Sequence, residues 1–341
     1  MEVPITRTIA ALFVLTGSSP LWGLQVINEI RSDQPGADMS EFVEIAAPPG
    51  TSLDGITYVV IGDGGGGLSG VIDFALDLTG QTVPADGLFV AAESTFDVGT
   101  FGAVVDLTAV LGFENNDNVT HLLVTGFSGA PGDDLDLDND GMLETEPWTG
   151  VMDRIALVHE PNPPLSTEFH YGPPFVGPAA AGAPPHVFRF PNGAAPLSSW
   201  NVGGLAMGAN DTPGVPNQPG FLSMADGGVQ PLLLDAGAAN ASRVYFLLGT
   251  ASGTFPGVLV DLVVLPLNFD SYTKSLLDAP NPPWLPESLG FLDGLGGGFT
   301  GFEFPVGLPP ELIGLTLEHA FVLFDPVCDF ASNPVPLTLS P

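Results

Sequence analysis

The chain has 341 residues and is strongly acidic: 39 aspartates and glutamates oppose 6 lysines and arginines, which leaves a net charge of −33 at pH 7. Such a charge attracts cations but repels phosphate backbones and anionic lipid headgroups, so we expect no nucleic-acid partner. A hydrophobic content of 45%, with 23 phenylalanines, excludes a disordered chain. The 44 glycines and 35 prolines predict many short elements separated by turns, as in β-sandwiches and barrels.

An export signal is expected at residues 1–23. Arg7 supplies a positive start, residues 9–15 an apolar stretch, and residues 17–20 a turn-prone end. The apolar stretch is too short for a resident transmembrane helix, and no later segment has eighteen consecutive apolar residues. We therefore expect a secreted or cell-surface protein without a transmembrane segment in the mature chain. Cys328 is the only cysteine, so no intrachain disulfide can form.

Short apolar segments bounded by Gly, Pro, Asp or Asn predict β-strands along the chain. They lie at 24–30, 42–46, 57–62, 71–76, 88–92, 119–124 and 154–159, and then at 232–235, 244–249, 258–265, 299–304, 316–324 and 336–339, with one helical turn at 309–312. Helical periodicity is scarce. The pattern predicts an all-β protein of two β-sandwich domains.

The sharpest candidate site is the acidic stretch DDLDLDNDGMLETEPW at 133–148. Asp136, Asp138 and Asp140 stand at positions 1, 3 and 5 of a calcium loop, Met142 offers its backbone carbonyl at position 7, and Glu144 falls at position 9. Gly at position 6 permits the turn that brings the later ligands round. Position 12 is a proline and no helices flank the loop, so it is not an EF-hand. We predict one bound calcium ion; the alternative is a solvated acidic loop.

Two other patterns have simpler explanations. GDGGGG at 62–67 satisfies the dinucleotide-binding spacing, but a strand-like segment follows it instead of a helix, which favours a hairpin connection. The five histidines show no metal-ligand spacing, although His159 and His170 lie near glutamates in the sequence and would form a metal site if that segment folded back.

The segment from about 160 to 220 is rich in proline, and its run EPNPPLSTEFHYGPPFVGPAAAGAPPH is unsuited to central strands. We expect either an ordered arm over the first domain or a flexible excursion. A domain boundary is expected at NDTPGVPNQPG, residues 210–220, where Pro and Gly concentrate.

The segment LQVINEIRSDQPGADMSEFVEIAAPPGTSLDGITYVVIGDG resembles the opening of a lamin-tail domain. The resemblance rests on Asn28-Glu29, on Phe42-Val43-Glu44-Ile45 and on Leu53-Asp54-Gly55, with the later pieces VPADGLFVAA and DTPGVPN. It implies an immunoglobulin-like sandwich over residues 24–218, with the acidic and proline-rich stretches as insertions. Family members in exported bacterial proteins serve as accessory or surface modules, sometimes beside a nuclease or phosphatase.

Residues 221–341 resemble a C-terminal β-domain of exported proteins from planctomycete-type bacteria, through LSMADGGVQPLLLDAGAANASRVYFLLGTASGTFPG, LPLNFDSYT and LEHAFVLFDP. The resemblance implies no particular activity. We therefore expect an exported, non-catalytic binding or structural module of the cell surface. Its partners would be cations and a surface polysaccharide or protein, and exposed sheet edges would permit homo-assembly. The alternatives are an accessory module of a secreted hydrolase system and a cryptic metal-dependent hydrolase.

Overall fold

The computed structural model describes residues 25–341 except 65–67, 97–101, 161–168, 180–181, 226 and 307–308. The export signal expected at residues 1–23 lies outside the described residues. Strands dominate the described chain, which confirms the all-β prediction at the level of fold class. None of the described helices has the length and apolarity that a membrane crossing requires.

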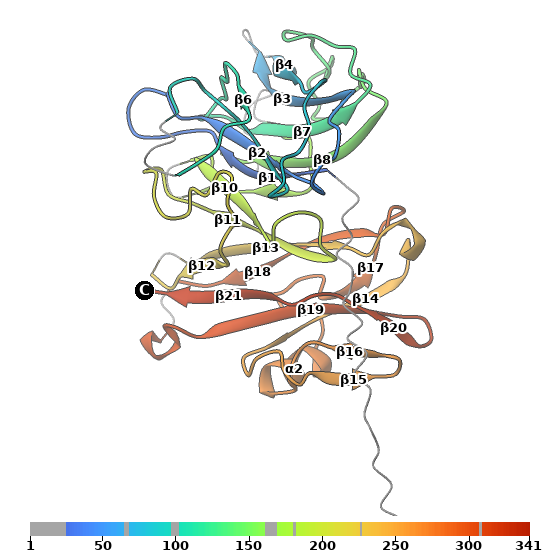
Figure 1. The fold of residues 1–341 in the computed structure, drawn as a ribbon. Coiled ribbons are helices and arrows are strands. Elements are labelled where there is room, and N and C mark those ends of the chain that lie inside the picture. The colour runs from blue at the N-terminus through green and yellow to red at the C-terminus, as the bar shows by residue number, and fades with distance from the viewer. Residues whose placement is uncertain are drawn as a thin grey trace, which may run out of the picture.

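The largest sheet has eight strands and extends through both stacked bodies of Figure 1. In spatial order it contains β18 (Gly297–Phe304), β13 (Gly228–Asp235), β11 (Leu197–Val202), β10 (His186–Phe190), β1 (Val26–Arg31), β2 (Phe42–Ala46), β5 (Leu88–Ala92) and β6 (Leu107–Thr108). β11 and β13 lie on either side of the expected domain boundary and pair antiparallel. The backbone ladder therefore continues from one half of the chain into the other.

A five-stranded sheet covers one end of the large sheet. It contains β4 (Leu68–Asp77), β3 (Ile56–Gly64), β7 (Val119–Thr125), β8 (Gly150–Leu157) and β9 (Phe175–Val176). Side chains such as Ile27 on β1, Tyr58 on β3 and Ile155 on β8 are fully buried in one shared core. The first half of the chain therefore closes its core between two layers of sheet.

A second layer pair encloses the core of the C-terminal half. The facing sheet contains β12 (Gly220–Ser223), β21 (Val335–Ser340), β19 (Thr316–Phe324), β14 (Val244–Thr250) and β17 (Leu289–Phe291), and β20 (Cys328–Ala331) pairs with β19. Leu232 on β13, Leu247 on β14 and Phe321 on β19 are fully buried in this core. Cys328 is also buried there, as a packed apolar residue.

The remaining elements are small. A separate two-stranded sheet consists of β15 (Val258–Val260) and β16 (Val263–Leu265), followed by α2 (Ser271–Asp278), with the 3-10 turns η1 (Ala238–Asn240) and η2 (Pro310–Leu312). The single strand predicted at 258–265 is wrong, because Asp261 adopts a left-handed φ of 46° and reverses the chain. The turn predicted at 309–312 is confirmed as η2.

Within the described part of the proline-rich run at 160–186, β9 is the one strand formed before β10 begins at the run's last residue, His186. β10 and β11 lie in the middle of the eight-stranded sheet and follow this run, with Pro191 and Pro196 in the connection between them. β9 pairs with β8 as an edge strand, and Phe175 contacts Phe299 of β18. In the GDGGGG motif, residues 62–64 end β3, which pairs antiparallel with β4 on the other side of residues 65–67; this agrees with the predicted hairpin, and residues 65–67 themselves lie outside the described residues.

Candidate metal site in the acidic loop

The acidic loop docks on β4 through its backbone and through one buried leucine. Leu135 donates its N–H to the carbonyl of Gly70 at 3.0 Å and accepts from the N–H of Glu144 at 2.9 Å. Its side chain is 2% exposed and packs in a small apolar cluster with Ile72 and Tyr171. Leu135 and Asp136 are both buried, whereas Leu137 and Asp138, which follow them, are exposed, so the chain leaves the protein surface between Asp136 and Leu137.

Asp136 is the fixed centre of the loop. It is fully buried, and its Oδ2 accepts hydrogen bonds from the hydroxyls of Ser69 (2.9 Å) and Tyr171 (2.7 Å) and from the N–H of Gly141 (2.9 Å). Its Oδ1 accepts from the N–H of Asp140 at 3.0 Å. Burial alone would raise the pKa of Asp136, but these four donors outweigh it and lower the pKa, so the carboxylate is ionised.

The other predicted ligands gather around Asp136. One carboxylate oxygen from each of Asp136, Asp138, Asp140 and Glu144 lies within 4.8 Å of the others. Asp138, Asp140 and Glu144 are exposed. Met142 contacts these carboxylates through its backbone N–H, which donates to Asp140 Oδ1 at 2.9 Å.

One further backbone contact closes the loop, and a glycine permits its turn. Glu144 Oε2 accepts from the N–H of Leu137 at 2.6 Å, so the ninth position reaches back to the second. Gly141 has a φ of 87°, as position 6 of a calcium loop requires. Oδ2 of Asp136 already accepts three hydrogen bonds, whereas Oδ1 accepts one and keeps a lone pair for a cation. Four oxygens at this spacing form a donor set suited to a hard cation.

A second acidic cluster, which the sequence did not indicate, lies beside the β3–β4 hairpin. It contains Asp63, Glu114 and Asp117, whose carboxylate oxygens lie within 4.8 Å of one another. Asp73 is adjacent. Its burial, and to a lesser extent repulsion from Glu114, raises its pKa to about 8. Burial also raises the pKa of Asp63 to about 6. Proton sharing among these carboxyls lowers their mutual repulsion without a metal ion.

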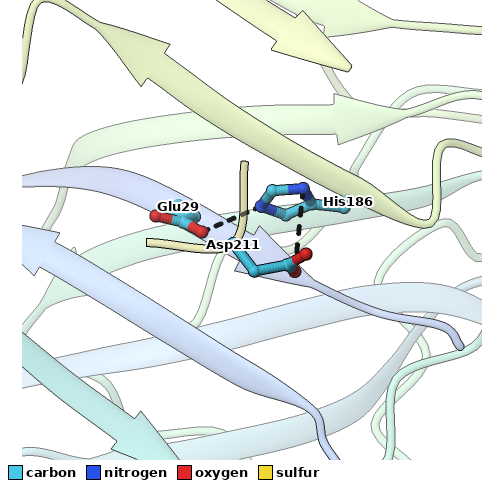
Figure 2. A group of neighbouring side chains, drawn as sticks. All are labelled: Glu29, His186 and Asp211. Atoms are coloured by element: carbon cyan, nitrogen blue, oxygen red, sulfur yellow. Dashed lines mark hydrogen bonds and ion pairs between the residues drawn. The ribbon is translucent and has the colours of Figure 1, made fainter. Parts of the chain in front are cut away.

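A third group is buried in the large sheet. Figure 2 shows Glu29, His186 and Asp211 facing one another. His186 Nε2 lies 2.9 Å from Glu29 Oε1, and Arg31 forms a buried ion pair with Asp211 while its Nη1 donates to the carbonyl of Gly204 at 3.1 Å. The Arg31 guanidinium already neutralises the charge of Asp211. Glu29, His186 and Asp211 are therefore better suited to a structural role than to binding a metal ion.

Proton counting shows the protonation state of Glu29. The Thr212 hydroxyl contacts both Glu29 Oε2 and Asn217 Oδ1, while Asn217 Nδ2 donates to the carbonyl of Arg189. One hydroxyl hydrogen cannot serve two acceptors, so a protonated Glu29 fits best. Burial raises the pKa of Glu29 to about 8, which agrees with this assignment.

Asn28, Glu29, Arg31 and Glu44 therefore belong to a buried network that holds the segment 204–217 on the sheet. Asn28 donates to Glu44 Oε1 at 2.6 Å, and Glu44 Oε2 accepts from the N–H of Gly214 at 2.6 Å. The residues that carry the lamin-tail resemblance thus make structural contacts. His159 and His170 belong to none of the three candidate metal groups found among the described residues.

No protein-family model matches the chain, and no curated protein matches it.

Proposed function

We propose that this protein is an exported, non-catalytic β-module of the cell surface whose acidic loop binds one calcium ion. The observation that carries the proposal is the convergence of four carboxylates, from Asp136, Asp138, Asp140 and Glu144, around one ionised and internally hydrogen-bonded aspartate. Concentrating anions in this way is unfavourable without a neutralising cation.

The chemistry of the site favours calcium over other cations. All the side-chain donors are hard oxygens, and the loop contains no thiol or imidazole that would favour zinc or copper. Three of the four ligands are exposed, so we expect an affinity on the order of 10⁻⁴–10⁻³ M, as in other extracellular modules. Such a site would be occupied outside a cell and largely empty in the cytosol.

We further propose that the first half of the chain, residues 24–218, has an immunoglobulin-like arrangement related to lamin-tail domains. Support comes from its two facing sheets and from the way Asn28, Glu29 and Glu44 hold the closing segment DTPGVPN. The calcium ion would stiffen a loop at the surface of this half. The module would then present that surface to a polysaccharide or protein partner.

Calcium titration by calorimetry tests the proposal. The wild-type chain should bind about one ion, and a chelator should lower its Tm, because ten times the Kd of calcium adds about 1.4 kcal/mol of stability. Asp138→Asn should weaken binding at least about tenfold without lowering the Tm of the metal-free protein, because it removes one of four mutually repelling carboxylates. Its carboxylate is exposed and has no hydrogen-bond partner among the described residues.

Glu311→Gln is the matched control. It also removes one exposed carboxylate, on η2, far from the loop in sequence. It should leave calcium binding unchanged. Equal affinities for Asp138→Asn and wild type, or no heat of binding at about ten times the expected Kd, would overturn the assignment.

A further inference from the structure

The outward face of the β15–β16 hairpin is apolar. Leu259 and Val264 are cross-strand partners, and they are 72% and 54% exposed. The next pair, Val260 and Val263, packs instead against the core of the C-terminal half, together with the buried Leu265. A solvated hairpin normally alternates apolar and polar residues, so this face has the composition of a covered surface.

More apolar surface gathers at both ends of the hairpin. Leu262, in the turn, is 74% exposed, and Phe255 and Phe269, at the base, are 87% and 57% exposed. Asn268 ties the base together, since its Nδ2 donates to the carbonyl of Phe255 at 2.9 Å. Exposed apolar residues concentrated in this way mark an interaction surface rather than ordinary scatter.

The charge of this segment differs from that of the rest of the chain. Residues 251–268 contain one charged side chain, Asp261, and its Oδ2 accepts from the N–H of Cys328 at 2.9 Å. Asp270, which follows, caps α2. In a chain with a net charge of −33, this is a face on which two copies can meet without bringing free carboxylates together.

The edge of β15 is open. β15 pairs with β16 alone among the described strands, whereas β16 lies against β20. The loop between Val260 and Val263 has two residues, so that pair exchanges hydrogen bonds across the hairpin and Leu259 does not. The N–H and C=O of Leu259 therefore point away from β16, as a free template for another strand.

We propose that this hairpin is a self-association surface, on which a second copy of the chain adds its own β15 antiparallel about a two-fold axis at Leu259. The two hairpins then form a four-stranded intermolecular sheet with Leu259 and Val264 of both copies on one face. A two-fold contact of this kind is closed and yields a dimer, not a fibre. The proposal does not depend on calcium binding.

The available area suits a weak dimer. An aromatic side chain buries about 150–250 Å², so Phe255 and Phe269 alone would remove roughly 300 Å² per copy at their present exposure. A stable interface needs about 800 Å² per partner. With the leucine and valine side chains added, the contact falls somewhat below that value, so we expect a dimer that dissociates on dilution.

Sedimentation equilibrium of the whole chain tests this inference. The wild type should show a monomer–dimer equilibrium that shifts about tenfold or more toward the dimer between low and high NaCl, because salt screens the repulsion between two acidic chains. Leu259→Pro should abolish the dimer while keeping the monomer folded, since it removes an N–H that the hairpin does not use. Val264→Asp should abolish it by placing a charge on the shared face.

Phe291→Asp is the matched control. Phe291 is 74% exposed on β17, the edge strand of another sheet, so its replacement should leave association unchanged. A monomer at every concentration and salt level would overturn the proposal, as would dimers that survive both hairpin variants. Binding of a monomer to vesicles of neutral phosphatidylcholine, lost in Val264→Asp, would also overturn it in favour of a lipid-facing hairpin.

Discussion

Gly141 lies where a side chain would collide with the protein. Its φ is 87°, and a Cβ added there would lie 2.6 Å from Cδ1 of Phe169. Gly141→Ala should therefore lower the free energy of unfolding by about 2–4 kcal/mol, from left-handed strain of about 1–2 kcal/mol and the cost of overpacking. Urea unfolding of the metal-free protein measures this loss.

Gly132→Ala separates the two contributions. Gly132 has a φ of 93°, but nothing lies within 4 Å of an added Cβ. Its replacement should cost only the backbone strain, about 1–2 kcal/mol. Equal losses for the two variants would show that Phe169 yields freely and that the close contact is unimportant.

Asp136 and Asp138 illustrate two roles for carboxylates in one loop. Asp136 is buried and accepts four hydrogen bonds, so it shapes the loop whether or not a cation is present. Asp138 is exposed, so only a ligand would give it a role. The spacing of the motif predicted both residues as calcium ligands and did not distinguish their roles. Their difference comes from Ser69 and Tyr171, which lie 67 and 35 residues away from Asp136 in the sequence.

Strand β1 is stabilised by contacts with the segment 204–217 as well as by pairing with its neighbouring strands. Arg31 of β1 is fully buried and forms an ion pair with Asp211. Asp211→Ala should therefore lower the free energy of unfolding by about 3–5 kcal/mol, because it leaves the guanidinium charge buried and unpaired. Hydrogen exchange should show faster opening of residues 204–217 in this variant.

An exposed ion pair provides the comparison. Lys274 and Asp278 on α2 are paired, with side chains 59% and 63% exposed. Asp278→Ala should cost less than about 1 kcal/mol, because solvent screens the pair. If both aspartate variants lost the same stability, burial would not be what gives the Arg31–Asp211 pair its value.

The strands that periodicity predicted well are those with β-branched or aromatic residues bounded by turn residues. The predicted strands at 42–46, 88–92 and 316–324 coincide with β2, β5 and β19. β10 and β11 were missed because the prolines before them were taken to describe the whole segment, although HVFRF itself has strand character. The signal for α2 was also present: Asp270 and Thr273 form a capping box at its start.

Side-chain clusters across the sheets could not be predicted from the sequence. Asp63 and Glu114 are 51 residues apart, and only the arrangement of β3 and the following loops brings them together. The candidate site in the acidic loop could be predicted because its ligands lie close together in the sequence. Local spacing therefore predicted one candidate site, and the other groups depend on topology.

For the molecule as a whole, stability should depend on two opposing sets of buried titratable groups. Burial raises the pKa of Glu29, Glu41 and Asp73 to about 8. Burial lowers the pKa of His121 and His186 to about 3. The first set keeps protons in the folded state that the unfolded chain releases above about pH 4.5, and the second lacks protons that the unfolded chain binds below about pH 6.5.

The signs of these two linkages predict a maximum of stability between about pH 4.5 and 6.5. From about pH 4.5 upward the folded state holds more protons on these carboxyls than the unfolded state, so each carboxyl removes up to about 1.4 kcal/mol per pH unit until its pKa near 8 is reached; the histidines oppose this loss only within that range. Below it the unfolded state binds more protons on its histidines, so stability falls again as the pH drops toward about 3.

Free energies of unfolding in urea at about pH 3.5, 5.5 and 8 should therefore be highest at the middle value. Glu29→Gln keeps a neutral side chain of the same shape in the buried network, so it should reduce the loss between about pH 5.5 and 8 by roughly the share of one carboxyl. The carboxyls outnumber the basic groups throughout the chain, and their mutual repulsion adds to the same loss. If Glu29→Gln lost as much stability as the wild type between about pH 5.5 and 8, Glu29 would be ionised in the folded protein, and the proton count at Thr212 would then be wrong.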